Sequence, residues 1–184
     1  LKLTKGNPAI KETEVYKVTQ YLNENRKSGR ILAYGDASLW LDVFSNLPQV
    51  NGFSELGNEH PYSDKAQEVI RNSKDPATIL AWLSAVNAKY LVVSKSDAEK
   101  YKGFLKKDFE AGDWIVFLVP LKNSSLVKIV DASKFDDFTF DGSEKSIKEY
   151  QKLIEANPSP QVANWPKNNQ LQVELNLEKN QGIV

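Results

Sequence analysis

The chain of 184 residues contains no cysteine and no methionine, and it has one histidine, His60. Without cysteine there is no disulfide framework, no thiolate metal site and no cysteine nucleophile. One histidine is too few for a zinc site, which normally takes several histidine or cysteine ligands. We therefore expect no bound transition metal and no cofactor.

The sequence also lacks net charge, because 24 lysines and arginines balance 24 aspartates and glutamates. A neutral chain has no overall field to attract a polyanion, so nucleic acid is not expected as a partner. No stretch approaches the roughly 20 apolar residues that a membrane-spanning helix requires, and no signal peptide opens the chain. The residues are expected to form a water-soluble domain.

What is present is an ordinary globular composition, with 41% hydrophobic and 26% charged residues. This length suits one hydrophobic core, so residues 1–184 are predicted to form a single domain. The chain starts at Leu1 without a methionine and stops inside the apolar run Gly182-Ile183-Val184. We therefore expect this domain to be a piece of a larger protein, one from which membrane segments could have been removed.

Alternating helix and strand signals predict an α/β fold. Buried strands are expected at residues 30–34 and 90–93, and the second run is apolar on both faces, as in a strand covered on each side. The expected core is a small, mostly parallel sheet flanked by helices. Residues 104–109 and 114–119 are predicted to form a hairpin, and residues 161–165 and 171–177 a further strand pair. These segments would add an antiparallel region in the C-terminal half. Helices are predicted around residues 7–27, 39–44, 63–70, 75–86, 96–103 and 143–157.

Asp36 and Ser38 follow the first strand, in the run Tyr34-Gly35-Asp36-Ala37-Ser38. Open α/β sheets usually bind ligands at the carboxyl ends of their strands, so both residues are candidate binding residues. The run matches neither a nucleophile elbow nor a phosphate-binding glycine pattern. The favoured interpretation of Asp36 is an N-cap of the next helix, and a binding role is the alternative.

His60 and Trp165 are the other two candidate binding residues. His60 lies in a long loop, residues 47–62, where it could join a metal or acid–base cluster or could simply be solvated. Its acidic neighbours are Glu55, Glu59 and Asp64. Trp165 lies on a polar turn, where an exposed aromatic ring could stack on a sugar. Trp82 and Trp114 lie in apolar patterns and are predicted to be core residues.

The order of segments resembles a known family. An amphipathic helix at residues 12–27 precedes the strand at residues 30–32, and a helix at residues 79–86 precedes Ala88-Lys89-Tyr90-Leu91-Val92-Val93. An acidic, aromatic hairpin, Glu110-Ala111-Gly112-Asp113-Trp114, follows. This order is similar to the extracytoplasmic soluble domain of polytopic glycosyltransferase C-type membrane proteins. It most resembles the archaeal group labelled 6-pyruvoyl-tetrahydropterin-synthase-related.

The resemblance implies a non-catalytic domain on the extracytoplasmic face of the membrane, within a glycosyltransferase-like parent. Its expected partners are the transmembrane part of the same polypeptide and a glycan or lipid-linked sugar. It carries over no catalytic residue, because the family's catalytic carboxylates lie in loops between membrane helices. The pterin label implies no pterin chemistry, since that enzyme needs three histidines on zinc. The alternative hypothesis is a free-standing cytosolic α/β enzyme with a site near Asp36 and His60.

Overall fold

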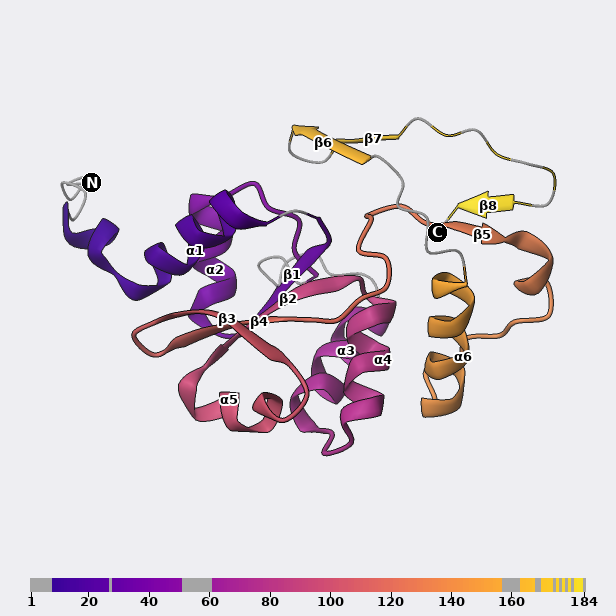
Figure 1. Cartoon of the computed structure of the whole chain (residues 1–184), viewed down its shortest axis with the longest axis horizontal. Helices are drawn as coiled ribbons and strands as arrows, with labels where there is room; N and C mark the ends of the chain where they lie inside the picture. The colour runs from indigo at the N-terminus through magenta and orange to yellow at the C-terminus, as the bar shows by residue number, and fades with distance from the viewer. Residues whose placement is uncertain are drawn as a thin grey trace.

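The computed structural model describes residues 8–26, 28–50, 61–156, 163–167, 170–173, 175, 177, 179 and 181–183. Figure 1 shows a main body of helices and strands, with α6 and the last strands beside it. The elements are, in chain order, η1 (Pro8–Glu12), α1 (Glu14–Asn25), β1 (Arg30–Ala33), α2 (Asp36–Phe44), α3 (Pro61–Asn72), α4 (Pro76–Ala85), β2 (Ala88–Ser94), α5 (Lys95–Lys102), β3 (Lys106–Ala111), β4 (Trp114–Leu118), β5 (Ile129–Asp131), η2 (Ala132–Lys134), α6 (Glu144–Glu155), β6 (Ala163–Lys167), β7 (Gln170–Val173) and β8 (Gln181–Ile183).

The main sheet has four described strands in the order β1-β2-β4-β3. The pairing of β1 with β2 is parallel, whereas β2–β4 and β4–β3 are antiparallel. The α/β class is confirmed, but the prediction of a mostly parallel sheet is not, because the sheet is mixed. The reason lies in the hairpin: Gly112 has a φ of 55°, which permits the tight reversal between β3 and β4. The hairpin then joins the main sheet alongside β2.

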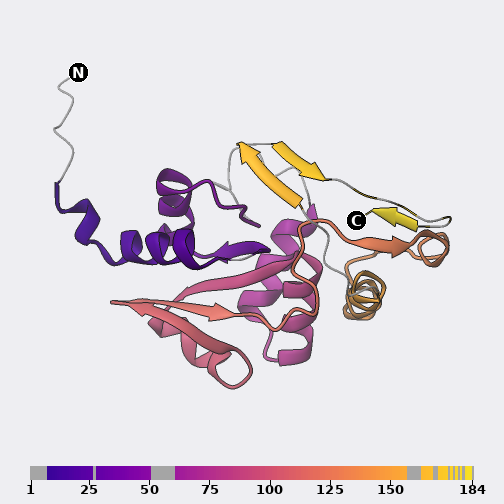
Figure 2. The ribbon, with the colours of Figure 1, turned by 45° about the horizontal axis from the view of Figure 1, so that its top comes forward.

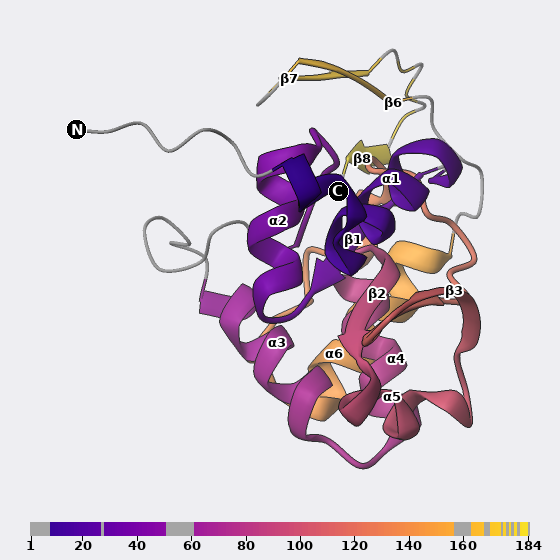
Figure 3. The ribbon, with the colours of Figure 1, turned by 90° about the vertical axis from the view of Figure 1, so that its left-hand side faces the viewer.

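Strand β2 is an inner strand of the main sheet, as its sequence predicts. Leu91 and Val92 are both fully buried, and they belong to two different core clusters on opposite faces of the sheet. On one face Leu91 shares a cluster with Ile79 of α4, and on the other Val92 shares one with Leu22 of α1. Figure 3 gives a second view of α1, α2, α3 and α4 around these strands. The expected burial of both residues is confirmed.

Helix starts follow local hydrogen bonding. The Asp75 carboxylate accepts from the backbone N–H groups of Ala77 and Thr78 at the start of α4, as predicted. The Ser143 hydroxyl accepts from the N–H of Ser146 at the start of α6, also as predicted. Helix α5 begins earlier than predicted, because Ser94 is its N-cap.

Two small sheets complete the described fold. Strand β5 pairs antiparallel with β8, and β6 pairs antiparallel with β7, so the predicted C-terminal strand pair is confirmed. Figure 2 shows both pairs apart from the main sheet. Across the described ranges, no helix combines the length and apolar character needed to cross a membrane.

Candidate functional site

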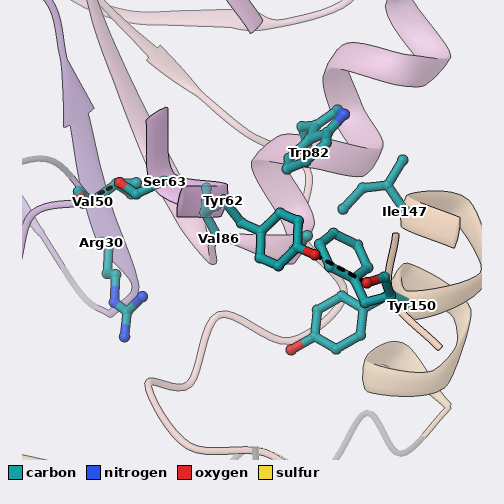
Figure 4. A pocket seen from close by; sticks show the side chains of 10 residues that line it. Arg30, Val50, Tyr62, Ser63, Trp82, Val86, Ile147 and Tyr150 are labelled. Carbon is teal, nitrogen blue, oxygen red and sulfur yellow. Dashed lines mark hydrogen bonds between the residues drawn. The ribbon is translucent and has the colours of Figure 1, made fainter. Parts of the chain in front are cut away.

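A cavity of about 520 Å³ lies at the amino end of the parallel pair β1–β2. This volume is in the range of roughly 300–1,000 Å³ that is typical of small-molecule sites. Figure 4 shows Arg30 towards one end of the cavity and the rings of Tyr62 and Tyr150 towards the other. The lining residues are Arg30, Val50, Tyr62, Ser63, Trp82, Ala85, Val86, Phe140, Ile147 and Tyr150.

Separate parts of the chain converge on this cavity. Arg30 is the first residue of β1, while Ala85 and Val86 lie just before β2. Tyr62 comes from the first turn of α3, and Tyr150 comes from α6. Helix α6 packs against α4, so its inward face becomes one wall of the cavity.

Phe140 is the centre of an aromatic wall. Its ring lies 4.4 Å from the Tyr62 ring, measured between centroids, with the planes at 74°. The rings of Tyr150 and Trp82 lie 5.8 and 6.1 Å from it. The Tyr62 hydroxyl donates a hydrogen bond of 3.0 Å to the Phe140 carbonyl, drawn as a dashed line in Figure 4. Edge-to-face packing and this bond hold the rings in place.

Arg30 supplies the polar end of the cavity. Its backbone N–H donates to the Asn87 carbonyl at 2.9 Å, which ties the start of β1 to the chain before β2. No described residue accepts a hydrogen bond from its guanidinium. The side chain is open to solvent, yet the protein around it lowers the pKa of Arg30 by desolvation, an effect that Tyr150 opposes. Burial likewise raises the pKa of Tyr150, whose hydroxyl has no hydrogen-bond partner among the described residues.

A second cation, Lys128, lies close enough to Arg30 for the two charges to repel each other. Lys128 is only 4% exposed, and its Nζ has no hydrogen-bond partner within the described ranges. Burial lowers the pKa of Lys128; Glu155 acts in the opposite direction, and Arg30 lowers that pKa further. The Glu155 carboxylate also accepts a hydrogen bond from the Ser84 hydroxyl.

The predicted site residues lie elsewhere or outside the described residues. Asp36 is exposed and is the first residue of α2, whose N-cap is Gly35 with a φ of 60°. The interpretation of Asp36 as the N-cap is therefore wrong, because the positive φ at the turn moves the helix boundary back to glycine. Ser38 is buried, and its N–H donates to the Gly35 carbonyl at 3.1 Å.

The other two candidates are not tested by the geometry. His60 lies outside the described residues, so a site shared with Asp36 stays a prediction. Trp165 belongs to β6, but its side chain is outside what the structure describes. Of the two tryptophans predicted to be core residues, Trp82 is 2% exposed and Trp114 is half-buried.

Sequence reasoning did not single out Arg30, Tyr62 or Phe140 as site residues. One signal was available: three phenylalanines fall within residues 135–140, just before the N-cap of α6. Such a cluster in a polar segment indicates that the segment folds back onto an apolar surface.

In the part of the chain that the structure describes, no three His, Cys, Asp or Glu side chains are grouped as metal ligands.

No family model, curated protein or solved structure matches this chain.

Proposed function

We propose that this chain is a non-catalytic, sugar-binding domain of a membrane-embedded, glycosyltransferase-like protein, acting on the extracytoplasmic face of the membrane. The aromatic pocket beside Arg30 is the observation that carries the binding role. The order of segments that resembles the glycosyltransferase C-type proteins supports the membrane-embedded parent. The transmembrane part of the same polypeptide and a glycan or lipid-linked sugar are its proposed partners.

The pocket's two kinds of surface match the two kinds of surface on a sugar. A pyranose ring has an apolar C–H face, which packs against aromatic rings such as those of Tyr62, Phe140 and Tyr150. Its hydroxyl groups need hydrogen-bond partners: Arg30 offers donors, and the Ser63 hydroxyl, which donates to the Val50 carbonyl at 3.4 Å, offers an acceptor. A largely apolar cavity with a few placed polar groups is the common form of a small-ligand site.

The binding role is tested by titrating the domain with glucose, N-acetylglucosamine and glucuronate, followed by ligand-detected NMR. We expect at least one sugar to bind, and we expect the Tyr150→Ala variant to weaken that binding about tenfold through loss of ring contact. Tyr150→Phe keeps the ring and should keep most of the affinity.

Tyr16→Ala is the matched control, because Tyr16 packs edge-on against Phe44 at 5.2 Å and does not line the pocket. It should leave the affinity unchanged. Binding that survives Tyr150→Ala, or the absence of binding to all three sugars, would refute the proposal. Urea unfolding of each variant separates lost binding from lost folding.

The proposed parent is tested at the level of the gene. We expect its full reading frame to encode about a dozen apolar segments, each long enough to span a bilayer. We also expect protease added outside intact cells to cleave this domain. A reading frame without apolar spans would contradict the proposed membrane location but not the sugar site.

A further inference from the structure

The charge around the pocket is uneven. Of the ten lining residues, Arg30 is the one that carries a charge, and no carboxylate lines the cavity within the described ranges. The Arg30 guanidinium is open to solvent and donates to no described residue, so its N–H groups can bind an anion that enters the cavity. Arginine is well suited to this role, because its planar fork matches carboxylate and phosphate oxygens.

Lys128 is a second cation near Arg30, although it does not line the cavity. It is nearly fully buried, and its Nζ has no hydrogen-bond partner among the described residues. Glu155 is the carboxylate that acts on Lys128, but one of its oxygens accepts from Ser84 and the other lies 3.9 Å from the Lys122 amine. Among the described residues, one carboxylate therefore acts on more than one cation, and positive charge exceeds negative charge at the polar end of the pocket.

We infer that the pocket selects sugars that carry a carboxylate or a phosphate, with Arg30 binding the anionic group and the aromatic wall holding the ring. This inference rests on the proposed sugar-binding function and names its substrate class. Lys128 strengthens the binding of the anion through its charge alone. The Tyr150 hydroxyl, which has no partner among the described residues, can donate to the same anionic group or to a neighbouring hydroxyl of the sugar.

The test is calorimetric titration with three probes: glucose, glucuronate and glucose 1-phosphate. We expect the two anionic sugars to bind about tenfold or more tightly than glucose, because a charge-assisted hydrogen bond is added. Arg30→Gln should bring their affinity close to that of glucose and leave glucose binding nearly unchanged. Arg30→Lys should keep part of the preference, since the charge remains and the fork is lost.

Two further variants sharpen the test. Arg71→Gln removes the same charge from an exposed arginine that lies over the Tyr34 ring, outside the pocket, and should have no effect. Lys128→Met should weaken the binding of the anionic sugars by about threefold and leave glucose binding unchanged. The buried Lys128 charge attracts the anion by long-range Coulomb interaction and makes no direct hydrogen bond to it. The ratio of glucuronate to glucose 1-phosphate affinity shows whether carboxylate or phosphate is the better ligand.

The outcomes separate the two proposals. If glucose binds, is lost with Tyr150→Ala, and matches the anionic sugars in affinity, the sugar site stands and the anion selectivity is refuted. If Arg30→Gln and Arg71→Gln weaken the anionic sugars equally, the preference comes from overall charge and the role of Arg30 is refuted. If none of the three sugars binds, the sugar-binding function fails as well.

Discussion

The two ends of the parallel pair β1–β2 use their polar groups differently. At the carboxyl end, a smaller cavity of about 170 Å³ lies between Tyr34 and α5. There Tyr101 donates its hydroxyl proton to the Ile70 carbonyl at 3.0 Å, and the Lys100 amine donates to the same carbonyl at 2.7 Å. Ile70 is in the last turn of α3, whose carbonyls have no partner inside the helix. The donors at this end therefore complete a helix.

At the amino end of β1–β2, the side-chain donors do not complete a helix. The side chains of Arg30, Lys128 and Tyr150 have no hydrogen-bond partners among the described residues, and the larger cavity adjoins Arg30 and Tyr150. Ligands of α/β sheets usually bind at the carboxyl ends, where helix N-termini converge. In this mixed sheet, α5 directly follows the carboxyl end of β2, and the donors without described partners lie at the opposite end.

The largest expected effect concerns β2, the strand that both ends share. Leu91→Ala should lower the free energy of unfolding by about 2–5 kcal/mol, and Val92→Ala by a smaller amount, because each leaves a cavity on one face of the sheet. Leu39→Ala is the matched control, since Leu39 is 39% exposed and should lose no more than about 0.5 kcal/mol. Urea unfolding measures all three. A near-neutral Leu91→Ala would contradict a central, doubly covered β2.

A smaller effect tests the comparison of the two ends directly. Tyr101→Phe removes the buried hydrogen bond to the Ile70 carbonyl and should lower the free energy of unfolding by about 1 kcal/mol. Tyr150→Phe removes a hydroxyl without a described partner and should change it by less than about 0.5 kcal/mol. The same urea measurement applies. Equal losses in the two variants would mean that the hydroxyls at both ends are structural.

The smallest effect is a pH dependence. Hydrogen bonds from the Lys95 and Lys107 amines lower the pKa of Glu110 to about 2. Because the folded-state pKa lies below the unfolded one, this contribution is present above about pH 5 and is lost as the pH falls towards 2. Glu110→Gln should therefore reduce the drop in urea midpoint between pH 7 and pH 3. Because Glu110 is exposed, the change should be small.

Asp141 precedes α6 and, like Glu110, has a lowered pKa. Hydrogen bonds from Ser146 and Ser143 lower the pKa of Asp141 to about 2, so Asp141→Asn should also reduce the acid-induced drop. Glu149→Gln is the control, because Glu149 is exposed on α6 and has no partner in the described ranges. If all three variants change the drop equally, the effect belongs to net charge and not to these particular contacts.

Much of the local structure could be predicted from the sequence, for a physical reason. The N-caps Asp75 and Ser143 depend on hydrogen bonds to groups two or three residues away. Burial on both faces of β2 follows from an uninterrupted apolar run, since strand side chains alternate. The wrong N-cap prediction at Asp36 also concerns neighbouring residues. Whether Gly35 or Asp36 caps α2 depends on the backbone angle φ of Gly35.

The sequence by itself therefore determined the α/β class, the central strand and the starts of α4 and α6, because these depend on residues that are neighbours in the chain. The tertiary structure decided which strands pair, and it alone assembled the pocket. Tyr62 and Phe140 are 78 residues apart in sequence, yet their rings pack together and share a hydrogen bond. No element that the structure describes brings an acceptor to the Arg30 guanidinium. Such features depend on long-range packing, which no local pattern of residues encodes.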